Sequence, residues 1–474
     1  MTGDSDAIAE TDEPHDVIVI GAGIAGLVAA NRAAQLGKRV VVLEKGEDKK
    51  YLCNSRYTYG TFHIHFTDVG APEEELFGKI LAATAGFARK DLARAIAKDG
   101  RRLMQWLRSE GVDLIDTGKE KYETNVLAPP WRTGFGLTWR GYAGDVALTR
   151  LEDNLRQRQG RLLRGTRAHS LRRTAEGIEV ATKAMHDGPK LSGCALVIAD
   201  GGFQADLDLL RAHISSAPEK LLQRNGGTAT GDGMRMAQAL GAAVTGLGVF
   251  YGHLHSRNAM TTDRLWPRPY ADELAAAAIV IDAAGNRFAD EGLGGITLSN
   301  AVAHLPDPLG ATIIFDQAIW DGPPGRRHVQ PPNPLIVEAG GTLYRADSIA
   351  ELAARIGVAP QRLKQVVGEY NAALAAGALH TLSPPRRTDR YRAWPINAAP
   401  FYALPICAAI TNTMGGIVVD GDGAVLDERD QPIPGLYAAG STIGGLNGGP
   451  NAGYVGGLIN ATIALRAAEA IAAG

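Results

Sequence analysis

The sequence predicts an α/β fold in which a parallel sheet carries an inserted, mixed α+β unit. Two strand–glycine–helix patterns predict the sheet, one at residues 16–36 and one at residues 436–473. Their strands are short, unbroken apolar runs, which is the pattern of strands buried on both faces of a parallel sheet. The segment from 249 to 395 contains no such unit, and this absence predicts a separate inserted part.

Length and composition exclude several classes of protein. The chain has 474 residues, 45% of them hydrophobic, and its 49 Lys and Arg nearly balance 51 Asp and Glu, giving a formal net charge of −2. Disordered chains are poorer in apolar residues, and surfaces that bind nucleic acid or anionic lipid are strongly basic. We therefore expect one or two compact domains, no nucleic-acid partner and a small-molecule ligand.

Cysteine usage and hydropathy favour a cytoplasmic protein. Cys53, Cys194 and Cys407 lie far apart, without the paired spacing of iron–sulfur, zinc or c-type haem sites. Residues 1–16 are acidic and polar, whereas a signal peptide has a basic start and an apolar run. No later stretch reaches the ~20 apolar residues of a spanning helix. We expect no metal site and no membrane span.

The first strand, turn, helix and second strand follow the order of a Rossmann-like dinucleotide-binding unit. The strands cover 16–20 and 39–43, and the turn has the form GxGxxG. Gly21 makes the turn, Gly23 lets the backbone approach a pyrophosphate, and Gly26 lets the helix pack on the strand. We expect an adenine dinucleotide whose phosphates meet the N-terminus of the helix, near Ala25.

Two further features distinguish between dinucleotides. Glu44 ends the second strand, 23 positions after Gly21, where a carboxylate binds ribose hydroxyls and disfavours the 2′-phosphate of NADP. The second glycine loop, at 440–457, precedes another helix. A second helix N-terminus suits a flavin, whose N1 and C2 carbonyl become negative on reduction, better than NAD. The alternative interpretation of this loop is a solvent loop without a ligand.

The order and spacing of several motifs resemble the fumarate reductase/succinate dehydrogenase flavoprotein family, especially its tricarballylate dehydrogenase and 3-ketosteroid dehydrogenase relatives. The motifs include DVIVIGAGIAGLVAANRAAQLGKRVVVLEKG near the start, LVIADGGF at 196–203, TGDGMRMAQALGA at 230–242, GNRFADEG at 285–292, TMGGIVVD at 413–420 and GLYAAGS at 435–441. The resemblance implies a Rossmann-like FAD-binding domain formed by 1–242 and 395–474, with an inserted mixed α+β capping domain at 243–394.

The resemblance also implies which residues hold FAD: Gly21, Gly23, Ala25, Gly26, Glu44, Lys45, Asn54, Ser55, Gly201, Asp232, Gly440, Ser441, Gly457 and Leu458. Asp232 resembles a ligand of the ribityl hydroxyls. Ser441 stands where the family usually has a glutamate, and a serine can still donate and accept hydrogen bonds. Tyr57 stands where succinate dehydrogenases carry the histidine that bonds covalently to the flavin. We therefore expect non-covalent FAD.

The arginines that bind dicarboxylates in fumarate reductases are missing from their positions. Gly294 and Tyr454 stand where the resemblance implies arginines, and Asn412 replaces a histidine. Carboxylates that enter a closed site without guanidinium partners meet a large desolvation penalty. Fumarate and succinate are therefore disfavoured. Three arginines near the motifs are candidates to clamp a single carboxylate: Arg56, Arg132 and Arg140.

The remaining polar residues predict chemistry at a carbon–carbon bond beside a carbonyl. The Tyr454 loop resembles that of 3-ketosteroid dehydrogenases, and a phenol bound to a carbonyl stabilises the enolate that forms when an α-proton leaves. The candidate catalytic residues are Tyr454, His253, Tyr251 and Tyr57. Alternation would place Tyr251, His253 and His255 on one face of a strand. The alternatives are that Tyr454 only lines the site, that His253 is structural, or that the two histidines bind a metal.

The sequence therefore predicts an FAD-dependent oxidoreductase that dehydrogenates or reduces a carbon–carbon bond adjacent to a carbonyl, by α-proton removal and β-hydride transfer to flavin N5. The expected substrate is a ketone or a mono-acid. The alternatives are a fumarate-reductase-like enoate reductase and a non-catalytic flavin-binding accessory protein. Since the chain has no haem or cluster motif, its electron acceptor would be oxygen, a quinone or another redox protein.

Overall fold

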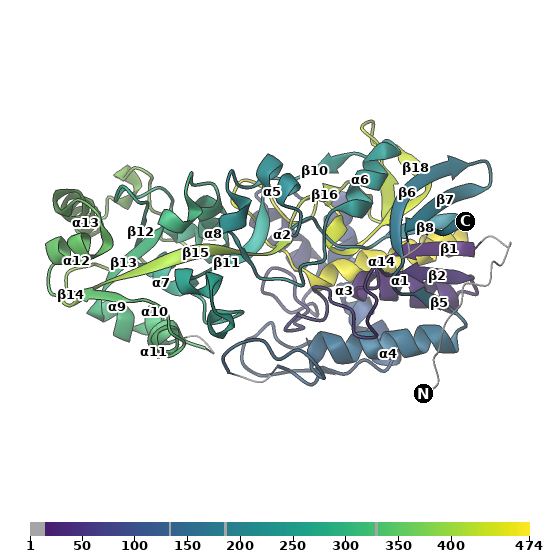
Figure 1. The fold of residues 1–474 in the computed structure, drawn as a ribbon, viewed down its shortest axis with the longest axis horizontal. Helices are drawn as coiled ribbons and strands as arrows, with labels where there is room; N and C mark the ends of the chain where they lie inside the picture. Colours follow the sequence, from purple (N-terminus) through teal and green to yellow (C-terminus); the bar gives the residue numbers. More distant parts are fainter. Residues whose placement is uncertain (1–14, 132–133, 184–186, 328–329) are drawn as a thin grey trace.

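One half of the molecule is built on an eight-stranded sheet whose centre is parallel (Figure 1). The computed structural model describes residues 15–131, 134–183, 187–327 and 330–474. The parallel strands lie in the order β18 (Pro432–Ala438), β8 (Asp187–Ile198), β1 (His15–Ile20), β2 (Val40–Leu43) and β5 (Arg161–Leu163). Three further strands extend it: β17 (Ala424–Leu426), β6 (Arg167–Thr174) and β7 (Gly177–Lys183). Segments from both ends of the chain thus share one sheet.

Helix α1 (Ile24–Gln35) confirms the predicted strand–turn–helix unit. Its many alanines allow close packing, and it contacts both α14 (Ala461–Ala473) and α4 (Ala143–Gln157). The helix ends at Gln35, and Gly37 follows its C-cap with a φ of +79°, in the region that favours glycine. Helix α3 (Lys90–Ser109) packs on α14.

A six-stranded sheet forms the other half. Its strands are β11 (Phe250–Ser256), β15 (Phe401–Thr413), β13 (Thr312–Asp316), β12 (Ile279–Ile281), β14 (Tyr344–Ala346) and β9 (Leu222–Gln223). The 13-residue strand β15 pairs with β11, β13, β14 and β9. Because β15 lies at 401–413 and β9 at 222–223, the expected boundaries at 242 and 395 do not coincide with the change of sheet.

Helical periodicity in the sequence predicts one continuous helix over 348–374, and the structure differs from this prediction in one detail. The structure contains two helices, α12 (Ile349–Ile356) and α13 (Pro360–Ala375). Gly357 ends the first with a φ of +75°, and Pro360 begins the second, where its missing N–H costs nothing. The sequence periodicity continues across this turn, which is why it predicted a single helix.

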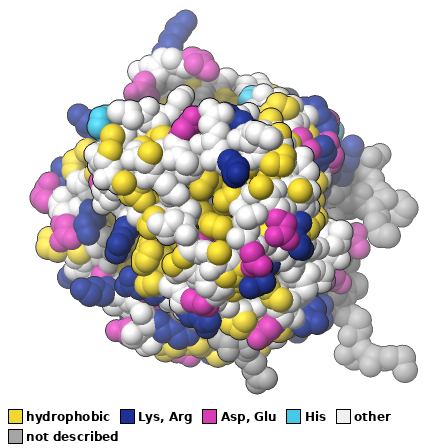
Figure 2. All heavy atoms as spheres, turned by 90° about the vertical axis from the view of Figure 1, so that its left-hand side faces the viewer, with side chains coloured by type: hydrophobic (Ala, Val, Ile, Leu, Met, Phe, Trp, Pro, Cys, Tyr) yellow, Lys and Arg dark blue, Asp and Glu magenta, His cyan; other side chains and the backbone are white. Residues whose placement is uncertain are grey.

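The remaining elements are short. They are α2 (Glu73–Ala83), β3 (Leu114–Ile115), β4 (Val126–Leu127), α5 (Leu207–His213), α6 (Asp232–Ala239), β10 (Val244–Thr245), α7 (Asp272–Ala277), α8 (Gly295–Ala303), α9 (Gln317–Asp321), α10 (Pro323–Arg326), α11 (Pro332–Glu338) and β16 (Gly416–Ile417). Across the described residues, no helix is long and apolar enough to cross a bilayer. On the face drawn in Figure 2, basic and acidic side chains are interspersed with apolar ones.

Candidate active site

A cleft collects residues from both sheets and from both ends of the chain. It is lined by the turn after β1, the end of β2, the loop at 52–63, the end of β15 and the segments that follow β8 and β18. Of the expected FAD-binding residues, all but Gly26 line it: Gly21, Gly23, Ala25, Glu44, Lys45, Asn54, Ser55, Gly201, Asp232, Gly440, Ser441, Gly457 and Leu458.

The glycine turn after β1 has the geometry that its sequence requires. Gly21 has a φ of +96°, and a Cβ there would lie 2.6 Å from the Ala199 carbonyl oxygen. A Cβ on Gly26 would lie 1.9 Å from the Gly21 carbonyl oxygen, so Gly26 serves helix–strand packing and does not line the cleft. A Cβ on Gly23 would meet only the Ser55 hydroxyl oxygen, at 3.2 Å. The Gly23 backbone is therefore open to the cleft.

Glu44 is fixed at the end of β2 by two backbone amides. Its carboxylate accepts hydrogen bonds from the amides of Ala22, at 3.1 Å, and Gly46, at 2.8 Å. Burial raises the pKa of this carboxyl, against the effect of the two amides. A carboxylate has about four lone-pair sites, so sites remain for hydroxyl donors in the cleft.

Asp232 lies beside Lys45 and already has cationic partners. Its carboxylate is 3.6 Å from the Lys45 ammonium and accepts hydrogen bonds of 2.8 and 2.9 Å from Arg167. Helix α6 begins at Asp232 and packs against β6, which carries Arg167. The Asp232 carboxylate therefore forms ion pairs with two cations. The sequence predicted a contact with the ribityl hydroxyls and did not predict these ion pairs.

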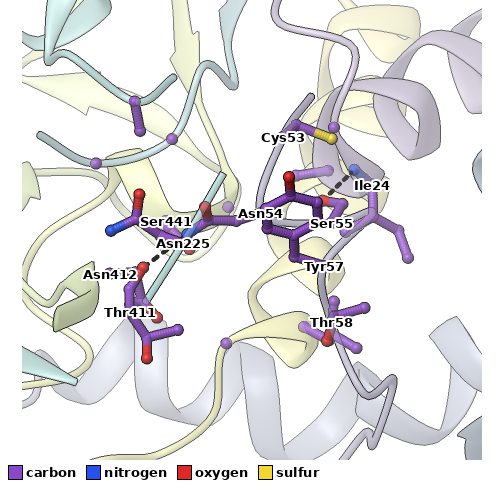
Figure 3. A pocket seen from close by; sticks show the side chains of 18 of the residues that line it. Ile24, Cys53, Asn54, Ser55, Tyr57, Thr58, Asn225, Thr411, Asn412 and Ser441 are labelled. Carbon is purple, nitrogen blue, oxygen red and sulfur yellow. Dashed lines mark hydrogen bonds between the residues drawn. The ribbon is translucent and has the colours of Figure 1, made fainter. Parts of the chain in front are cut away.

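Hydrogen bonds attach the loop after β2 to both halves of the molecule. The Ser55 hydroxyl accepts a hydrogen bond from the Ile24 amide at 3.0 Å, and the Asn54 side chain donates to the Thr411 carbonyl at 2.7 Å (Figure 3). Asn54 also accepts from the Gly226 amide at 2.9 Å. These bonds hold the loop against the N-terminus of α1 and the end of β15.

The three candidate catalytic residues other than Tyr57 form one hydrogen-bonded and stacked cluster. The Tyr251 and Tyr454 rings stack with centroids 3.8 Å apart and an interplanar angle of 12°. The Tyr251 hydroxyl is 3.0 Å from His253 Nε2, and His253 Nδ1 is 2.7 Å from the Asp272 carboxylate. Both tyrosines line the cleft, whereas His253 lies behind Tyr251. The sequence analysis missed Asp272, which shows no motif of its own.

Burial determines the protonation states in this cluster. It raises the pKa of both phenols, Tyr251 and Tyr454, so both remain protonated near neutrality. It lowers the pKa of His253, although Asp272 opposes this effect. A neutral His253 that donates from Nδ1 to Asp272 has Nε2 free to accept the Tyr251 proton.

Ring contacts place Tyr251, His253 and His255 on one side of β11, although the strand is irregular between Tyr251 and Gly252. Both histidine rings contact Tyr270, with His253 stacked at 4.0 Å and His255 edge-on at 5.5 Å. His255 is fully buried, with Nδ1 3.0 Å from the Leu265 carbonyl oxygen. Within the described part of the chain, no group of three ligands forms around these histidines.

Tyr57 and the expected arginine clamps are placed differently from this cluster. Tyr57 lines the cleft and contacts Trp139 and Trp266, with ring centroids 5.6 and 5.9 Å apart. Arg56 is fully buried in ion pairs with two carboxylates, so it cannot clamp a substrate. Arg140 is exposed. Arg132 lies outside the described residues.

The cleft contains two arginines that the sequence analysis did not name as candidate clamps. Arg224 and Arg268 both line it, beside Tyr270. They come from the segments LLQRNGG and WPRPY, which belong to none of the motifs that carry the family resemblance. The prolines on both sides of Arg268 are a signal for a rigid loop, but the sequence does not show that this loop faces the cleft.

Comparisons with known proteins agree with this architecture. A family model described as an FAD binding domain matches residues 16–454. NADH:fumarate oxidoreductase of Klebsiella pneumoniae (strain 342) is 28% identical over 459 residues, covering 93% of this chain; the chain spans only 45% of that relative. 4-Oxocyclohexanecarboxylate 2-dehydrogenase of Sinomonas cyclohexanicum is 27% identical, with 90% of this chain and 87% of the relative covered.

A solved structure shares the fold. The 3-ketosteroid Δ1-dehydrogenase from Sterolibacterium denitrificans has a TM-score of 0.70 and 20% identity, with 97% of this chain and 99% of that chain covered. Because the family match extends over most of the chain, the protein belongs to the FAD-binding domain family, the flavoprotein oxidoreductases that include the succinate dehydrogenases and fumarate reductases.

Proposed function

We propose that the protein dehydrogenates, or in the reverse direction reduces, a carbon–carbon bond adjacent to the carbonyl of a small ketone or mono-acid, with FAD as cofactor. The observation that carries the proposal is the stacked pair of Tyr251 and Tyr454, backed by His253 and Asp272 at the wall of the cleft. A flavin-binding protein without turnover has no need of a buried chain of hydrogen-bonded acid–base groups, since such a chain is costly to bury.

The residues of the cleft fit FAD. Gly23 leaves the backbone at the N-terminus of α1 open, as a pyrophosphate requires, and Glu44 keeps lone pairs for ribose hydroxyls. When bound, the flavin supplies a hydride acceptor at N5. Tyr57 supports non-covalent binding, because a phenol stands where the covalent histidine would be expected.

Tyr454 is proposed to donate a hydrogen bond to the substrate carbonyl oxygen. Its phenol stays protonated because burial raises its pKa, and a protonated donor stabilises the negative charge that develops as the α-proton leaves. Stacking on Tyr251 fixes the ring, so the donor is oriented before the substrate binds.

Tyr251 is proposed to take the α-proton while passing its own phenolic proton to His253. A free phenolate is unfavourable there because burial raises the pKa of Tyr251, so the proton must be handed on in the same step. His253 Nε2 is 3.0 Å away, and Asp272 stabilises the imidazolium that forms. Tyr251, His253 and Asp272 would thus share the roles of the hydroxyl group, the histidine base and the orienting carboxylate in a serine–histidine–aspartate triad.

Anaerobic half-reactions test the proposal. The oxidised holoprotein is mixed with 4-oxocyclohexanecarboxylate and with 4-methylcyclohexanone, and the reduced holoprotein with unsaturated acids, while the flavin absorption band is followed. We expect bleaching with a saturated ketone or recovery of the band with an unsaturated acid. The direction that responds distinguishes dehydrogenation from enoate reduction, and no response to any compound would support the non-catalytic alternative.

The division into domains also remains a proposal. We propose an FAD-binding domain formed by residues 1–242 and 395–474 and a capping domain at 243–394, with β9 and β15 from the first domain completing the sheet of the second. The cytoplasmic location stays a prediction. So does the electron acceptor, which would be oxygen, a quinone or another redox protein.

A further inference from the structure

We infer that Arg224 and Arg268, meeting at Tyr270, form a carboxylate-binding subsite, and that the substrate is therefore an acid with one carboxylate remote from the reacting carbon–carbon bond. The inference rests on the proposed function and specifies its substrate class. Neither arginine occupies a position where the resemblance to fumarate reductases implied one, at residues 294 and 454.

Arg224 reaches into the cleft from the segment after β9. Its guanidinium donates hydrogen bonds to the Tyr270 hydroxyl at 2.6 Å, the Thr411 hydroxyl at 2.8 Å and the Pro267 carbonyl at 3.2 Å. All three acceptors are uncharged. An arginine has five N–H donors, so two of them remain for a ligand.

Arg268 approaches the same phenol from a loop between two prolines. It hydrogen-bonds to Tyr270, and its guanidinium carbon lies 5.2 Å from the centre of the Tyr270 ring and 5.3 Å from that of Tyr59. These partners are also uncharged. Two cations therefore converge on one side of the cleft.

Neither guanidinium has a carboxylate within 4.0 Å among the residues that the structure describes. The buried arginines of the described residues differ in this respect, because Arg56, Arg287 and Arg386 each lie within that distance of a glutamate. Arg224 and Arg268 are half-buried, and the groups to which they hydrogen-bond are uncharged. An anion that enters the cleft would therefore meet two cations without having to displace a carboxylate of the described chain.

Two carboxylates of this region, those of Asp272 and Glu123, form hydrogen bonds with groups other than the two arginines. Asp272 accepts hydrogen bonds from His253 and from the Leu254 amide. Glu123, which lines the cleft, is hydrogen-bonded by Thr117. The positive charges of the two arginines affect Tyr270. They lower the pKa of its phenol, although burial alone would raise it.

The subsite lies next to the proposed catalytic cluster. The Tyr270 ring stacks on His253 at 4.0 Å, and His253 binds Tyr251. Thr411, which binds Arg224, precedes Asn412, the residue paired with Tyr251 across β11 and β15. A small molecule can therefore contact both the stacked tyrosines and the two arginines.

A competing explanation assigns the arginines to Tyr270 alone, as groups that convert its phenol into a base. The two explanations predict different substrate dependence. A carboxylate subsite affects acids and spares neutral ligands, whereas activation of Tyr270 affects the turnover of both kinds of substrate equally and leaves the binding of inert ligands unchanged.

Binding of inert ligands to the holoprotein separates these cases. Cyclohexanecarboxylate and cyclohexanecarboxamide are titrated while the perturbation of the flavin spectrum is followed, in wild type, Arg224→Gln and Arg268→Gln. The matched control is Arg264→Gln, an exposed arginine of the same loop. We expect wild type to prefer the carboxylate by about 10-fold or more, and each cleft variant to weaken carboxylate binding about 10- to 100-fold without changing carboxamide binding.

Turnover of 4-oxocyclohexanecarboxylate and 4-methylcyclohexanone gives the second readout. We expect the cleft variants to raise KM for the acid and to spare the neutral ketone. Equal losses on both substrates, or a wild type without preference for the acid in either assay, would overturn the subsite. The comparison of acid and neutral compounds in the wild-type protein tests the subsite even if a variant fails to fold. If the arginines control carboxylate binding but nothing is turned over, the proposed function fails while the subsite stands.

Discussion

At the scale of single residues, the Tyr454 hydroxyl carries the proposed polarisation of the substrate. Its ring stacks on Tyr251, and the Gly457 amide hydrogen-bonds to the phenol oxygen. Because Tyr454→Phe removes only that oxygen, we expect FAD to stay bound while stopped-flow reduction of the flavin slows by roughly 10²–10³. Loss of FAD would indicate a structural role. Unchanged FAD content and rate would mean that Tyr454 only lines the site.

Glu44 should determine affinity for FAD. Its carboxylate faces the cleft from the end of β2, held by the amides of Ala22 and Gly46. We expect Glu44→Ala to weaken FAD binding by about 1–3 kcal/mol through lost charged hydrogen bonds to the ribose, as measured by quenching of flavin fluorescence. Glu47→Ala, at an exposed position nearby, is the control. Equal affinities for both variants would contradict the assignment.

Asp200 should make stability depend on pH. Burial raises the pKa of its carboxyl to about 6, from 3.8 for the free group. The folded state therefore binds the proton more tightly, so this group's contribution to stability is lost as pH rises from about 4 to about 6. We expect Asp200→Asn to raise the free energy of unfolding by about 2–3 kcal/mol at about pH 7.5 and by far less at about pH 4.

Urea unfolding of the holoprotein at the two pH values measures this difference. Asp48→Asn, at an exposed position, is the control and should change stability at neither pH. A stabilisation of Asp200→Asn that is the same at both pH values would show that the carboxyl does not titrate as the burial argument requires.

At the scale of elements, the contact between β1 and α1 depends on Gly26. An added Cβ would lie 1.9 Å from the Gly21 carbonyl oxygen, so Gly26→Ala must force the helix away from the turn. We expect a loss of about 1–3 kcal/mol or more in the free energy of unfolding, with weaker FAD binding.

Gly368→Ala is the matched control, because Gly368 lies within α13 and a Cβ there would meet nothing within 4 Å. Alanine is the better helix former by about 1 kcal/mol, so this variant should be slightly stabilised. Thermal unfolding of both variants gives the comparison. If Gly26→Ala were as stable as Gly368→Ala, the close packing at the turn would not be essential.

At the scale of the whole molecule, we expect bound FAD to contact segments from both ends of the chain. The cleft is lined by the turn after β1 and by residues 440–458, which lie in loops more than 400 positions later. We expect FAD to protect the amides of both segments in hydrogen exchange and to leave α13 unchanged. Free FAD at about 100 times its Kd should add about 2.7 kcal/mol to stability. Protection confined to the N-terminal segment would contradict a site made from both ends.

The features that could be predicted from the sequence are local in the chain. The strand, glycine turn and helix at 15–35 depend on hydrophobic periodicity and on glycines at fixed spacing, both of which neighbouring residues express. The place of Glu44 at the wall of the cleft could be predicted because it follows the turn at a set distance. The alternation that places Tyr251 and His253 on one face is equally local.

Contacts between side chains that are distant in the sequence could not be predicted, because they depend on how the chain folds. Asp272 reaches His253, and Arg224 meets Arg268 at Tyr270, because the chain folds back along β11 and β15. No periodicity records such contacts, since they depend on sheet pairing between segments far apart in the chain. For the same reason, no sequence pattern indicates that Arg56 forms buried ion pairs, or that the cleft contains two arginines without a carboxylate partner among the described residues.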